Sequence, residues 1–292
     1  MIEDIKNEIK QDRYIEVGQT YRCSKNQVYT ATIAKQNKVK HLIIGEKYKS
    51  VGSKACMNMT KIHCLELASS IISIGDSAFK ACTQIVSVKM SDYVEQIGEA
   101  AFMECRKLRR INLPPTLKTI QPRTFKLCRS LQKIELPMQL VELGENAFIE
   151  CDSLKTITLP KKIRIIPFRA FYGCKALEEV VLPSDLKEIG REAFVSCFIK
   201  TIYFPDNLEL IGESAFAKCK FLESVSIPTS VKRIEKWAFH GCPRLNKVVF
   251  RHDPEFLGDW LFNRGNTVVY CRKNSKVDAY CQHFQYQTQY IE

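Results

Sequence analysis

The 292-residue chain has little of what would mark it as an enzyme. It holds only five histidines, and these form no recognisable set with an acid and a nucleophile. It has neither a G-x-x-x-x-G-K-[ST] phosphate loop nor a G-x-G-x-x-G turn. We therefore expect no catalytic residue, no cofactor and no small-molecule substrate. The sequence predicts that the protein is not an enzyme.

Long apolar runs are also missing. No stretch approaches the ~20 apolar residues of a membrane-spanning helix, and the charged first residues are not followed by the apolar core of a signal peptide. We expect no membrane span. The sequence as given predicts a cytoplasmic protein, whereas a leader that had been removed would place it at the cell surface or outside the cell.

The composition narrows the class of protein further. Hydrophobic residues make up 45% of the chain and charged residues 26%, the balance of a soluble globular protein, which excludes intrinsic disorder. The 13 cysteines are an odd number in a chain far too long to be a small disulfide scaffold.

What the chain does have is an internal repeat with a period of about 23 residues, which must be recognised before any other feature of the fold. Phenylalanine marks every repeat at one constant interval, shortened by a single position before Phe216: Phe79, Phe102, Phe125, Phe148, Phe171, Phe194, Phe216, Phe239 and Phe262. Cysteine stands at the third position after each phenylalanine and forms what we call the cysteine ladder: Cys82, Cys105, Cys128, Cys151, Cys174, Cys197, Cys219 and Cys242.

A third set of positions alternates with period two, as in Leu108-x-x-Ile111-x-Leu113. A weaker copy at Val39-x-x-Leu42 extends the series towards the N-terminus, giving about ten strand units. This alternation predicts strands with one buried side, stacked in parallel on their neighbours. A proline usually follows each strand, where its missing N–H ends the hydrogen-bonded ladder.

Between strands, a glycine precedes the Ala-Phe pair, and we expect a short helical turn there. The residue after the glycine is often acidic, which suits the positive N-terminal end of such a turn. Gln121, Pro167 and Glu235 replace the glycine in three repeats. Because proline cannot adopt positive φ, this position is not predicted to be left-handed.

The complete pattern, I-G-x-x-A-F-x-x-C-x-x-L-x-x-I-x-L-P, strongly resembles the BspA-like leucine-rich repeats of bacterial surface antigens. The resemblance covers roughly residues 39–271. It implies a right-handed leucine-rich-repeat solenoid of the α/β type, with a continuous parallel sheet on one face and short helical turns opposite. It also implies an interaction scaffold, since some family members are adhesins that bind host matrix proteins or other cells.

We divide the chain into an N-terminal cap (1–38), the repeats (39–266) and a C-terminal cap (267–292), because the open ends of a solenoid need closing elements. In the N-terminal cap, Ile2, Ile5 and Ile9 suggest a helix, and strands are expected at 14–17, 21–23 and 28–33. In the C-terminal cap, we expect a strand at 267–271, a helix at 275–284 and an extended segment at 286–291.

The cysteine ladder is interpreted as structural. Met59 and Gly265 occupy ladder positions in flanking repeats, so the column accepts residues that cannot form disulfides. We expect buried, reduced thiols that act as small hydrophobes, which favours a reducing compartment. Disulfides or a metal are the less favoured alternatives. Cys271, Cys281 and His283 could supply three zinc ligands but lack a tight C-x-x-C pair.

Positive charge is concentrated in the middle repeats. Residues 106–175 contain 15 Lys/Arg against 5 Asp/Glu, within a chain whose net charge is +12. The simplest explanation is a mixed, solvated surface. The sharper hypothesis is an attractive field for an acidic protein partner, centred on strand positions that face outward: Arg109, Arg110, Lys133 and Lys155. Nucleic acid is disfavoured, because aromatic residues are not interleaved with the basic ones.

Together these observations predict a non-catalytic protein–protein interaction scaffold that acts as a monomer. One alternative is a cell-surface adhesin. Another, from a different class, is a basic scaffold for an anionic polymer or nucleic acid, for which binding would depend strongly on salt.

Overall fold

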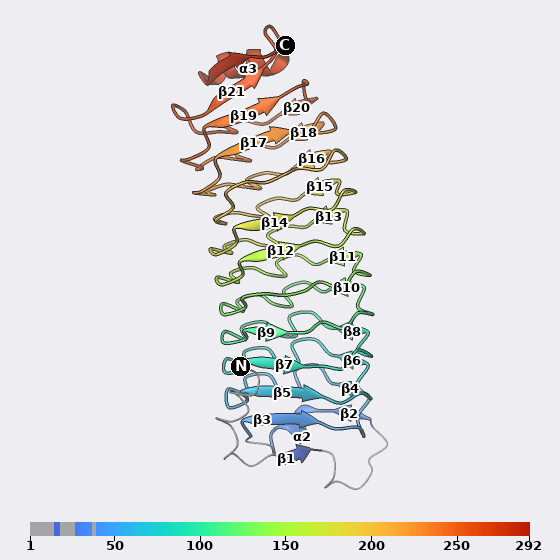
Figure 1. Ribbon diagram of the computed structural model, residues 1–292. Helices are drawn as coiled ribbons and strands as arrows, with labels where there is room; N and C mark the ends of the chain where they lie inside the picture. Colours follow the sequence, from blue (N-terminus) through green and yellow to red (C-terminus); the bar gives the residue numbers. More distant parts are fainter. Residues whose placement is uncertain (1–14, 18–26, 37–38) are drawn as a thin grey trace.

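Each repeat forms one coil of a parallel β-solenoid, and successive coils stack along one axis (Figure 1). The computed structural model describes residues 15–17, 27–36 and 39–292. Within these residues every strand pair is parallel, and between the repeats the register advances by about one repeat, as in Cys64↔Ser87 and Ser87↔Arg110. The predicted solenoid of stacked repeats is therefore confirmed.

The predicted strands form what we call the first strand row, whose exposed side chains make up the sheet face. Its strands are β1 (Ile15–Val17), β3 (His41–Ile44), β5 (Cys64–Leu67), β7 (Ser87–Lys89), β9 (Arg110–Ile111), β12 (Thr156–Thr158), β14 (Glu179–Val181), β17 (Ser224–Ile227), β19 (Lys247–Phe250), β21 (Val268–Cys271) and β22 (Gln287–Tyr290). The row is not the continuous sheet that we expected. It is interrupted at residues 131–138, and at Thr201 it narrows to a single bridge to Ser224.

A second strand row, which the sequence pattern did not reveal, runs parallel to the first (Figure 1). Its members are dipeptides: β2 (Val28–Tyr29), β4 (Ser50–Val51), β6 (Ser73–Ile74), β8 (Gln96–Ile97), β10 (Thr119–Ile120), β11 (Glu142–Leu143), β13 (Ile165–Ile166), β15 (Glu188–Ile189), β16 (Leu210–Ile211), β18 (Arg233–Ile234) and β20 (Phe256–Leu257). In nearly every member only the second residue is buried, so no alternating pattern could mark these strands.

The segment from glycine to cysteine, which we call the turn side, is not helical, and our expectation of helical turns was wrong. It is a succession of tight turns in which every fourth residue is left-handed, for example Ser77 (φ 54°) and Ala81 (φ 57°). Its N–H groups alternate between two kinds of partner. The N–H of Phe79 donates to the carbonyl of Ala101 in the next coil at 2.8 Å, whereas that of Lys80 donates to the carbonyl of Ser77 in its own coil at 3.1 Å. These i→i−3 turn bonds and bonds between coils replace the i→i−4 bonds that a helix would need.

The repeated glycine serves close packing of the backbone. Gly144 does not have positive φ, which confirms the expectation from the sequence. A Cβ atom at this position would lie 2.4 Å from the nitrogen of Pro122 in the preceding coil. Glycine is therefore favoured at Gly144 because two coils approach each other here, and not because of its backbone freedom.

Inside the solenoid, the repeated phenylalanines form one continuous stack from Phe79 to Phe262. Consecutive ring centroids are separated by 5.2–6.0 Å and the rings lie within 21° of parallel. All nine side chains are buried. The core is thus a column running along the axis of the molecule, and each coil contributes one ring to it.

The C-terminal cap agrees with the sequence. Strand β21 is followed by helix α3 (Lys276–Phe284), which begins after Ser275, whose hydroxyl accepts the N–H of Asp278. Strand β22 then pairs with β21. Among the described residues α3 is the longest helix, and none of these residues forms a helix long and apolar enough to cross a bilayer.

The N-terminal cap agrees only in part. Strand β1 lies within the predicted segment 14–17 and pairs with β3. The predicted strand 28–33 is wrong beyond Tyr29, because helix α2 (Ala31–Ala34) replaces its second half. The predicted helix around Ile2, Ile5 and Ile9 and the predicted strand 21–23 lie outside the described residues.

Candidate interaction surface

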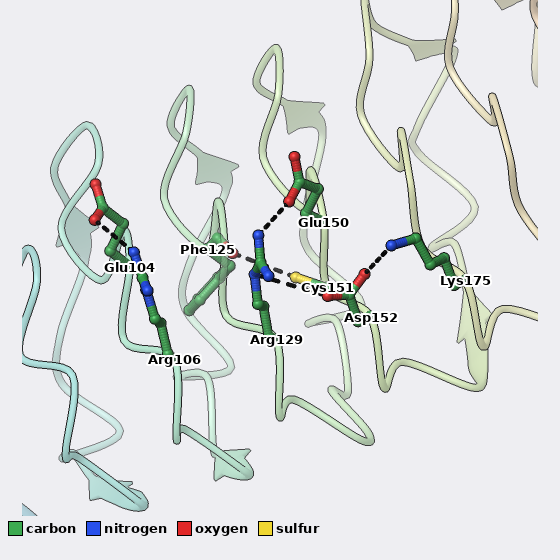
Figure 2. Close-up of polar contacts among 8 residues, drawn as sticks. All are labelled: Glu104, Arg106, Phe125, Arg129, Glu150, Cys151, Asp152 and Lys175. Carbon is green, nitrogen blue, oxygen red and sulfur yellow. Dashed lines mark hydrogen bonds and ion pairs between the residues drawn. The ribbon is translucent and has the colours of Figure 1, made fainter.

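The cysteine ladder is buried and all its thiols are free. The structure adds a role that the sequence did not show. Each ladder sulfur donates to a carbonyl of the preceding coil at 3.0–3.3 Å, as Cys151 Sγ does to Phe125 O (Figure 2). Cysteine therefore fills a small apolar space and also gives a buried carbonyl a hydrogen bond.

Burial raises the pKa of the ladder thiols from Cys82 to Cys219, and for Cys82 the value reaches about 12. Since the thiolate is the reactive form, these groups are inert at neutral pH. The zinc alternative gains no support, because no three His, Cys, Asp or Glu side chains converge on a possible metal position in the described part of the chain. The functional surface must be sought elsewhere.

Many basic residues of the middle coils lie beside the turn side and are already neutralised. Arg129 pairs with Glu150 at 2.7 Å and with Asp152 at 3.7 Å, and Lys175 lies 3.7 Å from the other oxygen of Asp152 (Figure 2). Arg106 pairs with its neighbour Glu104 at 3.7 Å. These cations are bonded to acids of the same protein and do not form an open field for a partner.

The four basic residues predicted as a binding centre, which we call the basic strip, lie on the sheet face. All are exposed: Arg109, Arg110, Lys133 and Lys155. The N–H of Gln132 donates to the carbonyl of Arg109 and the N–H of Lys155 to that of Gln132, both at 3.4 Å. These bonds place the strip on three successive coils, although the middle coil forms no strand.

The basic strip differs from the turn side in how its charges are balanced. Lys133 pairs with Glu135 at 2.7 Å, and both side chains are largely exposed. Among the described residues, no acid lies within ion-pair distance of Arg109, Arg110 or Lys155. The strip therefore keeps positive charge available to a ligand.

An acidic boundary lies beyond Lys155. Glu178 pairs with Lys200 at 2.8 Å. This hydrogen bond and the charge of Lys200, with a smaller effect of the Lys155 charge, lower the pKa of Glu178. Glu179, directly opposite Thr156 in the sheet, is exposed. The exposed residues of the sheet face thus change from basic at the coil of Lys155 to acidic at the coil of Glu179.

Two residues of the sheet face that the sequence analysis did not single out are Tyr203 and Val181. Tyr203 is 84% exposed and Val181 is 55% exposed, on neighbouring coils. One signal could have indicated Tyr203. It belongs to the coil that is a single position shorter than the rest, where Cys197-Phe198-Ile199 replaces the usual C-x-x-L spacing.

Comparison with known proteins places the chain in a family. Residues 28–154 and 142–268 match the model of the BspA-type leucine-rich repeat region, which contains six copies of the repeat. The match spans most of the chain, and the protein belongs to the BspA-type leucine-rich repeat family. No curated protein matches it.

Solved structures give the same fold. The chain is similar to the leucine-rich repeat protein of T. pallidum, with 28% identity over 56% of this chain and 78% of that one, and a TM-score of 0.54. It also resembles the pneumococcal vaccine antigen PcpA, with 16% identity over 87% of this chain and 79% of that one, and a TM-score of 0.52.

Proposed function

We propose that the protein is a non-catalytic interaction scaffold that binds an acidic protein surface through the basic strip. The observation that carries the proposal is the contrast in charge balance. Arg106, Arg129 and Lys175 pair with internal acids, whereas Arg109 and Arg110 project from the sheet face without such partners among the described residues. Unpaired surface charge of one sign steers an oppositely charged partner and raises its association rate.

The rigidity of the scaffold supports this role. The strip rests on buried Leu108, Leu131 and Leu154, which belong to one core together with the phenylalanine stack. Because the backbone beneath the strip is fixed, binding requires little ordering beyond that of the four long side chains. Membership in the BspA-type repeat family is consistent with the proposal.

The test compares two charge reversals that change the net charge equally. One variant carries Glu at Arg109, Arg110, Lys133 and Lys155. The control carries Glu at four exposed basic residues that follow the first strand row: Lys118, Lys161, Lys162 and Arg164. Binding of fluorescent poly-L-glutamate, used as an acidic polypeptide probe, is measured by anisotropy across a salt series.

We expect reversal of the strip to weaken binding at low salt by about tenfold or more and to flatten the salt dependence. The control should retain most of the affinity. Equal losses in the two variants would contradict the site, because they would show a response to net charge alone. Preferential binding of a single-stranded oligonucleotide by the strip, with no binding of polyglutamate, would contradict the protein-partner proposal and favour nucleic acid.

A further inference from the structure

The short coil gives the sheet face a second feature with its own chemistry. Tyr203 lies between Ile202, which is buried, and Phe204, which packs against Phe216 and Phe239 with ring centroids 5.6 and 6.4 Å away. Its neighbours on both sides therefore point inward, and the tyrosine ring projects outward at 84% exposure. No other large apolar or aromatic side chain among the described residues is as exposed.

The backbone of Tyr203 is held in place although its side chain is exposed. The inward packing of its two neighbours fixes the backbone at Tyr203, so binding must order only the two side-chain torsions of the tyrosine and not the backbone. Val181, on the preceding coil, is 55% exposed and adds apolar surface beside it. Tyrosine is enriched among the residues that dominate binding energy in protein interfaces.

The separation of the two features suits one interface. Tyr203 lies four coils beyond Arg110, which corresponds to about 19 Å at the usual spacing of parallel strands. A protein interface of ordinary size buries ~800 Å² on each partner, which is wide enough to include both. Glu179 lies on the coil between the basic strip and Tyr203 and repels an acidic group of a ligand there. A ligand must therefore place its acidic part over the strip and a non-acidic part over the coils of Glu179 and Tyr203.

We propose that the basic strip and Tyr203 form one two-part binding surface. Its partner is a protein segment that is acidic over the coils of Arg110, Lys133 and Lys155 and apolar over those of Val181 and Tyr203. This inference rests on the proposed function, since it takes the acidic character of the partner from it. What it adds is an apolar anchor and a fixed order of the two parts along the solenoid axis.

The experiment uses two probes and the full chain. Poly-L-glutamate reports on charge alone, and a random copolymer of glutamate and tyrosine reports on charge together with aromatic contact. We expect the copolymer to bind more tightly than polyglutamate, and Tyr203→Ala to remove this advantage, a loss of about tenfold. Tyr203→Phe should keep most of the advantage, because it keeps the ring.

The matched control is Tyr93→Ala, since Tyr93 is 66% exposed and lies in the turn after β7, away from the strip. It should leave binding of both probes unchanged. If Tyr203→Ala binds the copolymer as tightly as the unaltered protein does, the anchor is wrong. The proposed function would survive that result provided that reversal of the strip still weakens polyglutamate binding. If polyglutamate binds all variants equally, the proposed function is contradicted, and the two-part surface that rests on it is contradicted as well.

Discussion

The turn side and the sheet face of this solenoid are built by different rules. On the turn side the coils from Phe79 to Cys242 repeat the same contacts: a phenylalanine ring stacked on its neighbours, a cysteine sulfur bonded to the preceding coil and alternate backbone N–H groups bonded to the next. On the sheet face the strands are interrupted twice, and the exposed residues change from basic to acidic to aromatic.

The difference shows where the fold gets its stability. The contacts of the turn side persist through coils in which the first strand row is absent, so the stack of coils does not depend on an unbroken sheet. The sheet face is therefore free to vary, and a ligand can be recognised there without disturbing the core. Three predictions test this contrast, in order of expected effect.

The largest expected change in the free energy of unfolding follows a rise to alkaline pH. Burial raises the pKa of the ladder thiols from Cys82 to Cys219 above the ordinary value of 9.0. Because the folded-state pKa is raised, their stabilising contribution is complete below pH 9 and is lost as pH rises towards the folded value. Each thiol should reduce the free energy of unfolding by about 1.4 kcal/mol per pH unit in that range.

Denaturant unfolding measured between pH 8 and pH 11 gives this slope. A variant with Cys105→Ala and Cys151→Ala is the control, since it removes two titrating thiols and should show a shallower decline. A slope that does not change when two ladder thiols are removed would show that other groups cause the alkaline loss.

The second prediction compares a buried and an exposed aromatic residue. Phe148 is fully buried between Phe125 and Phe171, with ring centroids 5.4 Å away on both sides. Phe148→Ala should lower the free energy of unfolding by about 3–5 kcal/mol. Tyr203→Ala, on the sheet face, should change it by less than about 0.5 kcal/mol. Similar unfolding midpoints for the two variants would contradict the division of roles.

The third prediction, with the smallest expected change in the free energy of unfolding, compares two arginines. Arg129 bridges Glu150 and Asp152 beside the turn side, whereas Arg109 on the sheet face has no acid within ion-pair distance in the described chain. Arg129→Ala should cost about 0.5–1 kcal/mol, since exposed ion pairs contribute little. Arg109→Ala should have almost no effect on stability. A greater loss for Arg109→Ala would mean that the strip has a structural role.

Much of the turn side could be predicted because its residues repeat. The spacing of Phe and Cys located the buried columns, and period-two alternation located the first strand row. The prediction of a helical turn was wrong because the spacing of the Ala-Phe pairs indicates only which residues are buried. It does not indicate whether a backbone N–H bonds within its own coil or to the next coil. The second strand row has one buried residue per strand and leaves no periodic signal.

The sequence could predict where the basic residues of the candidate site lie, but not which of them are paired with acids. Alternation indicated that Arg109, Arg110, Lys133 and Lys155 would share one face, and all four are exposed on the sheet face. Which cations are neutralised depends on side-chain contacts between coils, such as that of Arg129 with Asp152 of the following repeat. Tyr203 was missed because an outward tyrosine in an alternating segment is ordinary in sequence, although the one-residue shortening of its coil distinguishes it.

The equivalence of the junctions between coils also makes the length of the molecule adjustable. Ring separations of 5.2–6.0 Å recur at every junction of the phenylalanine stack, so duplication or loss of one repeat would rejoin matching surfaces. A coil inserted between Arg110 and Tyr203 would move them about 4.8 Å further apart. Recombination between repeats could thus change the spacing of the two parts of the binding surface in fixed steps, with no new packing to evolve.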